Sequence, residues 1–396
     1  MRFGFRKMVC GALGIAMACV LGAGVARAQV ADGGTAQKPL MADDVFKNIQ
    51  VLRGVPVREF MQTMGFFAAS LSLNCVDCHI GESAGSWPRY ADDTPLKQTA
   101  RKMVVMVRVL NQGSFAGARK VTCYTCHRGS PRPEVIPSLD QQYESPAAPD
   151  ADRAEIMDNA RKTPTADQIL DRYITVLGGA AKLAKVKSFV AKGTYMGFDT
   201  DFQDTPVQIY AKSPDQKSMV VNLGDDGTVT TTFDGMNAWI ASPVSHSPVQ
   251  VIPLQGSELD GAKVDALVAF PEKLKESLTD WKIGFPEQEI NGKAVQVVEG
   301  TEGKTPIRFY FDKTTGLLVR VTRFTDTIIG TVPTRTEFSD YRLIPALGIK
   351  MPYKIVDTWT DGQSKINLTL ITPNAAVDDA KFNKPLPPVS KEAAAK

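Results

Sequence analysis

Two five-residue segments of this chain, Cys75–His79 and Cys123–His127, share the pattern Cys-x-x-Cys-His. Two thiols at this spacing can form thioethers with the two vinyl groups of a haem, and the histidine that follows can bind the iron. We call the two segments the first and the second haem motif. They predict two covalently attached c-type haems, with these attachment residues and iron ligands: Cys75, Cys78, Cys123, Cys126, His79 and His127.

Zinc is the alternative metal, because two Cys-x-x-Cys pairs can supply four thiolates. The pairs in this chain are farther apart than is usual in such sites. Zinc also gives no reason for a histidine directly after each pair, so haem is the favoured prediction.

The second axial ligand of each iron is predicted to be a methionine. The chain has three histidines, and the one outside the motifs, His246, is interpreted as a solvent-facing loop residue. Two methionine pairs with i, i+3 spacing precede the motifs, Met61 with Met64 and Met103 with Met106. Met64 and Met106 are the predicted ligands, although a methionine on an apolar helix face often only fills a core, which leaves the choice within each pair open.

A helix is predicted ahead of each motif. Between residues 56 and 73 the apolar residues recur at i, i+3 and i+4, which is typical of an amphipathic helix. A second helix is expected to begin at Thr94-Pro95, because proline is favoured in a first turn, and to end near Gly113. Residues 44–133 are therefore expected to form a mainly α dihaem cytochrome c domain.

Residues 165–386 have a different pattern. A capping box at Thr165–Gln168 begins one helix, and a helical insert is expected near residues 261–278. The rest consists of strand-like runs separated by turn pairs such as Asn291-Gly292. This pattern predicts an α+β domain with a curved antiparallel, half-barrel sheet, so the whole chain is expected to be multidomain.

The remaining segments are predicted to be targeting or connecting sequences. Residues 1–28 combine a basic start, an apolar stretch and the cleavage pattern Ala-Arg-Ala, which indicates a signal peptide and a periplasmic protein, soluble or peripheral to the membrane. Residues 29–43 are expected to be a disordered N-terminus, 134–164 a Pro-rich linker and 387–396 a tail. Beyond the leader, acidic and basic residues nearly balance, which gives no indication of a nucleic-acid partner.

The runs 45–79, 90–111 and 121–133 resemble the cytochrome c subunit of photosynthetic reaction centres. The resemblance implies an axial methionine on the helix before each motif and places Met64 and Met106 at those positions. It also implies an electron carrier rather than an enzyme, with redox partner proteins such as a membrane-bound reaction centre or respiratory complex. That subunit typically has four haems, whereas this chain has two motifs.

The second region is similar in architecture to LolA/LolB-like periplasmic domains, on the segments Phe233–Trp239, Tyr341–Pro352 and Asp378–Pro385. The resemblance implies an apolar cavity for a lipid or lipoprotein group. The predicted function is a periplasmic dihaem electron-transfer protein. The alternative is a haem-containing binding protein whose sheet domain holds a lipid or hydrophobic ligand, and a dihaem peroxidase is a third reading.

Overall fold

The computed structural model describes residues 38–137, 150–160, 162–243 and 249–387. The predicted signal peptide, His246, most of the predicted disordered N-terminus and nearly all of the tail lie outside these residues, as does part of the predicted linker. The described residues from Pro39 onward belong to one compact unit. Within the described ranges, no helix is both long enough and apolar enough to cross a membrane.

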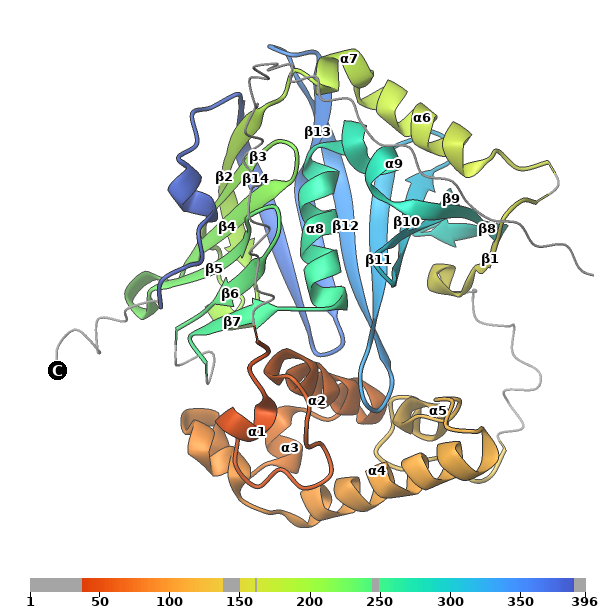
Figure 1. Cartoon of the computed structure of the whole chain (residues 1–396), viewed down its shortest axis with the longest axis vertical. Coiled ribbons are helices and arrows are strands. Elements are labelled where there is room, and N and C mark those ends of the chain that lie inside the picture. The colour runs from red at the N-terminus through yellow and green to blue at the C-terminus, as the bar shows by residue number, and fades with distance from the viewer. Residues whose placement is uncertain (1–37, 138–149, 161, 244–248, 388–396) are drawn as a thin grey trace, which may run out of the picture. The chain divides into compact units, whose positions relative to one another are not determined.

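The first region is helical, with both long helices where the sequence predicted them (Figure 1). The longest, α4, begins at a threonine cap, where Thr94 Oγ1 accepts a hydrogen bond from Lys97 N at 3.1 Å, and Pro95 occupies its first position. The haem motifs form the two short helices α3 and α5. The elements are α1 Ala42–Val45, α2 Val57–Leu71, α3 Cys75–Cys78, η1 Gly81–Gly85, η2 Trp87–Ala91, α4 Pro95–Ser114 and α5 Cys123–His127.

The second region contains a 14-stranded sheet, counted over the described residues, in the order β1-β8-β9-β10-β11-β12-β13-β14-β2-β3-β4-β5-β6-β7. Every neighbouring pair is antiparallel, as predicted. The strands are β1 Glu155–Met157, β2 Ser188–Met196, β3 Thr205–Lys212, β4 Gln216–Asn222, β5 Thr228–Phe233, β6 Ala238–Ala241, β7 Val251–Leu254, β8 Thr279–Ile290, β9 Lys293–Glu302, β10 Thr305–Asp312, β11 Leu318–Asp326, β12 Thr331–Ile344, β13 Ile349–Trp359 and β14 Gly362–Pro373.

The helices of this region are α6 Ala166–Leu177, α7 Ala180–Leu183, α8 Ser257–Ala269 and α9 Leu274–Ser277, with short turns η4 Ala151–Arg153, η5 Phe198–Thr200, η6 Gly224–Asp226, η7 Pro271–Lys273 and η8 Asp379–Phe382. Helix α8 contacts β4, β5 and β11. These strands are far apart in the sheet order, so one helix can reach all of them only because the sheet curves around it (Figure 1). The prediction of an open curved antiparallel sheet is confirmed.

Four strands were not predicted from the sequence. Strand β1 lies inside the predicted linker and pairs with β8, Glu155 opposite Phe285, so the sheet starts before Thr165. Strands β1, β6 and β7 are only three or four residues long, too short to show an alternation. Strand β8 has register shifts between Thr279 and Lys282 and between Gly284 and Gln288, which interrupt its period of two.

Side chains of the two regions also share buried contacts. The turn between β11 and β12 contributes Ile329 to an apolar cluster with Phe66 of α2 and Val104 of α4. Arg119, ahead of the second haem motif, forms an ion pair with Asp326 at 2.9 Å. The helical region is therefore packed against the tip of a hairpin of the sheet.

A buried carboxylate on α8 makes a second contact between the regions. Glu258 accepts hydrogen bonds from Arg58 Nε at 3.2 Å and Gln62 Nε2 at 2.6 Å, both on α2, and lies 3.6 Å from Arg323 of β11. The side chain of Glu258 is only 5% exposed. Burial raises its pKa, but the two guanidinium groups prevail and hold the pKa at about 2.

Candidate functional site

The first haem motif forms a one-turn helix whose start is fixed by a capping box. Asn74 Oδ1 accepts hydrogen bonds from Val76 N and Asp77 N at 3.0 and 3.2 Å, and Asp77 Oδ2 accepts one from Asn74 N at 2.8 Å. The helical turn puts the two thiols on one side, because residues three apart are neighbours on a helix surface. Cys75 is exposed and Cys78 partly exposed.

The second haem motif has the same local design. Thr122 N donates a hydrogen bond to Thr125 Oγ1 at 3.0 Å at the start of α5. Cys123 is buried in the cluster with Phe66 and Val104, whereas Cys126 is exposed. At the end of the helix, Gly129 N donates to a carbonyl of α2, Ser70 O, at 3.0 Å, which ties this motif to α2.

Helix α4 holds both motifs. Near its start, Thr94 Oγ1 donates to Cys78 O at 2.5 Å. Near its end, the buried side chain of Asn111 donates to Val121 O at 2.7 Å and accepts from Val121 N at 2.9 Å. The two anchoring residues are separated by roughly 26 Å along the axis, at 1.5 Å per residue.

Both motif histidines are oriented by a backbone carbonyl. His79 Nδ1 lies 3.1 Å from Tyr90 O, and His127 Nδ1 lies 3.0 Å from Ser130 O. A carbonyl oxygen can only accept a hydrogen bond, so Nδ1 is the donor in each ring, and in the neutral ring the lone pair is on Nε2. This is the arrangement that a metal-binding imidazole needs, with one nitrogen orienting the ring and the other free to coordinate.

The thiols are also in the state that haem attachment requires. All four cysteines of the described residues are free of disulfides. Burial is the main cause that raises the pKa of Cys75, Cys78 and Cys123 and thus favours the thiol form. The part of the chain that the structure describes contains no group of three or more His, Cys, Asp or Glu side chains placed to hold a metal ion.

The two predicted methionine ligands differ in their exposure to solvent. Met64 is partly buried and packs against the cluster that includes Cys123. Met106 is 50% exposed on α4. Their partners Met61 and Met103 are both partly buried.

Exposed apolar side chains surround Met106 on α4. Val105, Val109 and Leu110 are 48%, 67% and 40% exposed, so this helix presents apolar side chains both to the core and to solvent. Tyr124, inside the second motif, is 48% exposed. An apolar surface next to free thiols and an imidazole oriented by a carbonyl fits a haem, whose ring has two large apolar faces.

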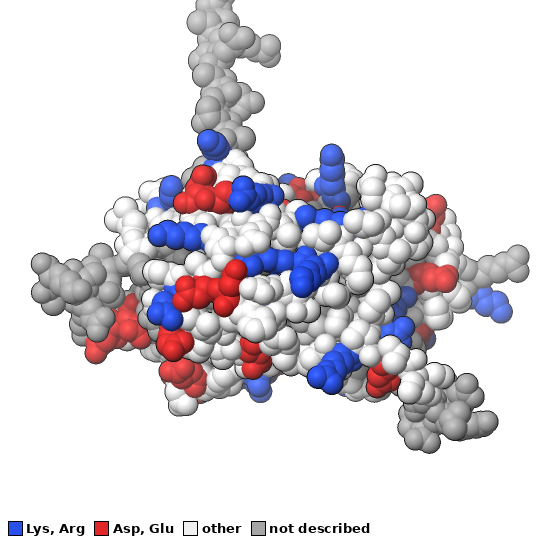
Figure 2. Space-filling view, turned by 90° about the horizontal axis from the view of Figure 1, so that it is seen from below, with Lys and Arg blue, Asp and Glu red and all other residues white. Residues whose placement is uncertain are grey.

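The surface charges are mixed on one face of the molecule. Figure 2 shows basic and acidic side chains interspersed there, with broad uncharged areas between them. Between the first motif and α4, Arg89 pairs with Asp92 at 2.8 Å, and Arg101 of α4 pairs with Asp93 at 2.8 Å. A partner that docks on this face would meet no large field of one sign.

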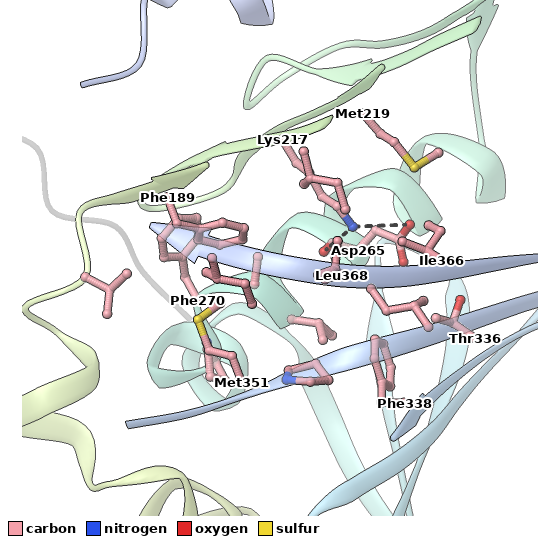
Figure 3. Close-up of a pocket in the computed structure, with 18 of the residues that line it drawn as sticks. Phe189, Lys217, Met219, Asp265, Phe270, Thr336, Phe338, Met351, Ile366 and Leu368 are labelled. Atoms are coloured by element: carbon pink, nitrogen blue, oxygen red, sulfur yellow. Dashed lines mark hydrogen bonds and ion pairs between the residues drawn. The ribbon is translucent and has the colours of Figure 1, made fainter. Parts of the chain in front are cut away.

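The sheet encloses a second candidate site. A cavity of about 140 Å³ lies between α8 and the curved sheet, lined mainly by apolar side chains such as Phe189, Phe270 and Met351 (Figure 3). The polar residues at one end include Lys217 and Asp357. The sequence analysis did not identify these two, because a single charged residue in a strand normally faces solvent.

Comparison with known proteins supports the assignment of the first region. The family model "Photosynthetic reaction centre cytochrome C subunit" matches residues 17–174, which is less than half of the chain. The N-terminal part of this chain is similar to reaction-centre cytochrome c subunits.

Two curated relatives define the extent of the match. The photosynthetic reaction center cytochrome c subunit of Thermochromatium tepidum is 38% identical over 97 residues, 24% of this chain and 23% of the relative. The subunit of Rubrivivax gelatinosus is 34% identical over 100 residues, 24% of this chain and 25% of the relative. The chain thus spans about a quarter of the length of these relatives.

Solved structures similar to the chain cover its other part. They include a LolA superfamily protein from Nitrosomonas europaea, at 14% identity and a TM-score of 0.39, with 56% of this chain and 99% of that protein covered. A DUF1329 family protein from Desulfovibrio piger has the same identity and TM-score, with 56% and 98% covered.

Proposed function

We propose that this protein is a periplasmic electron carrier with two c-type haems, bound through Cys75 and Cys78 and through Cys123 and Cys126. The observation that carries the proposal is the matched pair of Nδ1–carbonyl hydrogen bonds, which leaves Nε2 of both motif histidines available for iron. The similarity of the N-terminal part to reaction-centre cytochrome c subunits supports it. The redox partner would be a membrane-bound reaction centre or a respiratory complex.

The bound haem would supply reversible one-electron chemistry at iron. The residues of the chain have the supporting tasks. The cysteines hold the ring covalently, Tyr90 O and Ser130 O orient the two imidazoles, and the apolar side chains of α4 exclude water from the ring.

A direct test counts the haems. Pyridine haemochrome analysis of the exported protein, combined with intact-mass measurement, should give two covalent haems per chain. A protein exported to the periplasm that carries no covalent haem would refute the proposal.

We further propose Met64 and Met106 as the second axial ligands. A thioether ligand favours ferrous iron and raises the reduction potential relative to a second histidine. Met64→Ala should therefore weaken the Met–Fe charge-transfer absorption of the ferric protein and lower the potential of one haem, while Met61→Ala should change neither. The opposite result would assign the ligand to Met61. On α4, the same comparison is made between Met106→Ala, which should lower the potential of a haem, and Met103→Ala, which should not.

The cavity favours a second candidate function, the binding of an apolar ligand by the sheet region. The walls are largely apolar and belong to α6, α8 and the strands β2, β3, β12, β13 and β14. Mass spectrometry of an organic extract of the purified protein tests this function. An extract without a co-purified ligand, together with no uptake of added alkyl compounds, would reject it.

A further inference from the structure

The cavity has an apolar end and a polar end. Strand β13 lines the cavity along most of its length, from Ile349 and Met351 to Ile355 and Asp357. Eight residues of strand separate Ile349 from Asp357, roughly 26 Å at 3.3 Å per residue. Figure 3 shows Phe189, Phe270 and Met351 at one end and Lys217 with Asp265 toward the other.

The polar end opens to solvent. The side chain of Asp265 on α8 is 56% exposed although it lines the cavity, which marks this end as the mouth. Lys217 is 25% exposed, and its Nζ lies 4.0 Å from Asp265 Oδ2. A molecule with one polar end can therefore keep that end at the mouth and place its apolar part along β13.

The mouth has more negative than positive charge. Lys217 pairs with Asp265, whereas Asp357 accepts its hydrogen bond from a neutral group, Thr336 Oγ1, at 2.6 Å. Arg323 also acts on Asp357, but it is held by Glu258 at 3.6 Å. Burial and the nearby Asp265 raise the pKa of Asp357, and Thr336, Lys217 and Arg323 act in the opposite direction.

The apolar end has one lining group of each sign. Glu272 follows Phe270 and Pro271, and Lys350 lies between Ile349 and Met351. Glu272 Oε2 is buried and has no hydrogen-bond partner among the described residues, while Lys350 is exposed. The formal charges at this end sum to zero, whereas the mouth has Lys217 against two carboxylates, Asp265 and Asp357.

We propose that the cavity binds a single-chain amphiphile with a cationic ammonium head, its chain along β13 and its head at the carboxylates of Asp265 and Asp357. An anionic head, such as a fatty-acid carboxylate, would add a third negative charge at the mouth. Like charges brought together in a binding site are strongly disfavoured. This inference rests on the second candidate function and names the class of ligand for it.

The size of the cavity limits the length of the ligand's alkyl chain. A volume of about 140 Å³ is close to the 150 Å³ of an engineered apolar cavity that binds benzene. Met219 and Met351 line the cavity, and methionine side chains adapt readily to new shapes. A medium-length alkyl chain is therefore the appropriate probe.

The test compares three eight-carbon ligands on the full-length haem-loaded protein: octylammonium, octanol and octanoate. At about pH 7.5 the first is cationic and the last anionic. Octanoate has one methylene fewer beyond its head, which accounts for about fourfold in affinity, less than the effect expected from the charge. Calorimetric titration should give octylammonium a dissociation constant at least about tenfold lower than that of octanoate, with octanol between them. Equal binding of octanol and octylammonium, or tighter binding of octanoate, overturns the proposal.

Variants identify the group that selects the head. Asp357→Asn removes the charge and keeps an acceptor for Thr336, so the preference for octylammonium over octanoate should fall to about threefold or less. Glu276→Gln, at a side chain that is 74% exposed and does not line the cavity, is the matched control and should keep the full preference. An unchanged preference in Asp357→Asn overturns the assignment of Asp357 as the group that selects the head. If that variant does not fold, Asp265→Asn makes the same test at an exposed position.

The result separates the possible failures. If none of the three ligands binds, the second candidate function fails together with this inference. If all three bind with equal affinity, the cavity binds apolar chains but does not select the head. The haem count is measured on the same preparation and is independent of either result.

Discussion

The helical region and the sheet region are stabilised in different ways. The sheet region has one large core, in which Phe309, Leu318 and Ile307 are fully buried together with residues of α6 and α8. The buried cluster of the helical region is small, and two of its members, Ile329 and Val332, come from the sheet region. The sheet therefore buries its own apolar residues, whereas the helical region obtains part of its core from a hairpin of its neighbour.

The exposed apolar side chains of α4 extend this contrast. A surface helix normally turns one apolar stripe inward and a polar face outward. In α4, Val104 and Val107 face the core while Val109 and Met106 are at least half exposed. The helical region is thus expected to depend on its haems for stability, and the sheet region to be independent of them.

The largest expected effect is the loss of one haem. Cys123→Ser combined with Cys126→Ser removes both thioethers of the second motif, and haem content should fall from two per chain to one by pyridine haemochrome assay. The helical content of the first region should fall as well, because the apolar side of α4 loses its cover. The reciprocal pair at Cys75 and Cys78 should also leave one haem. Retention of two haems in either variant would contradict the assignment.

A large effect on stability is expected in the core of the sheet. Phe309 is fully buried and packs on Trp281 with ring centroids 5.7 Å apart. Phe309→Ala should lower the free energy of unfolding by about 3–5 kcal/mol and leave the haem count unchanged. The control is Phe198→Ala, at a side chain that is 76% exposed, which should cost less than about 0.5 kcal/mol. Loss of haem in the Phe309 variant would show that the two regions are not independent.

Acid should weaken the contact between the regions through Glu258. Its pKa is about 2 in the folded protein against 4.5 as the reference value, so the ionised carboxylate stabilises the fold fully above about pH 4.5. This contribution, about 3 kcal/mol, should be lost as the pH falls from 4.5 toward 2. Urea unfolding of Glu258→Gln should show a lower stability at pH 7 and a weaker dependence on pH in that window. Glu276→Gln, which is exposed, should keep the wild-type profile.

A smaller effect is expected at the tip of the hairpin. A side chain at Gly330 would run into the ring of Phe66 on α2. Gly330→Ala should therefore cost about 1–3 kcal/mol and loosen the contact between the regions, measured by hydrogen exchange of α2. Gly113→Ala, where an added Cβ meets nothing within 4 Å, should be neutral or slightly stabilising. Equal behaviour of the two variants would mean that the hairpin does not brace the helical region.

The predictions from sequence were accurate where local pattern decides the structure. The helix from residue 56 to 73 is α2, and the capping box at Thr165–Gln168 begins α6 as expected. Apolar periodicity and turn residues act over a few neighbours, so they can be read without the fold. The short strands β1, β6 and β7 carry too few residues for such a pattern and exist because their neighbours pair with them.

The sequence by itself determined which residues can attach haem, because Cys-x-x-Cys-His places two thiols and an imidazole together within one helical turn. Only the tertiary structure decided the contacts formed between distant segments. It brings Tyr90 O to His79, Ile329 to the second motif, and Asp357 to the mouth of the cavity. Each of these depends on how separate elements pack, and a carbonyl or a lone carboxylate carries no local pattern that reveals its partner.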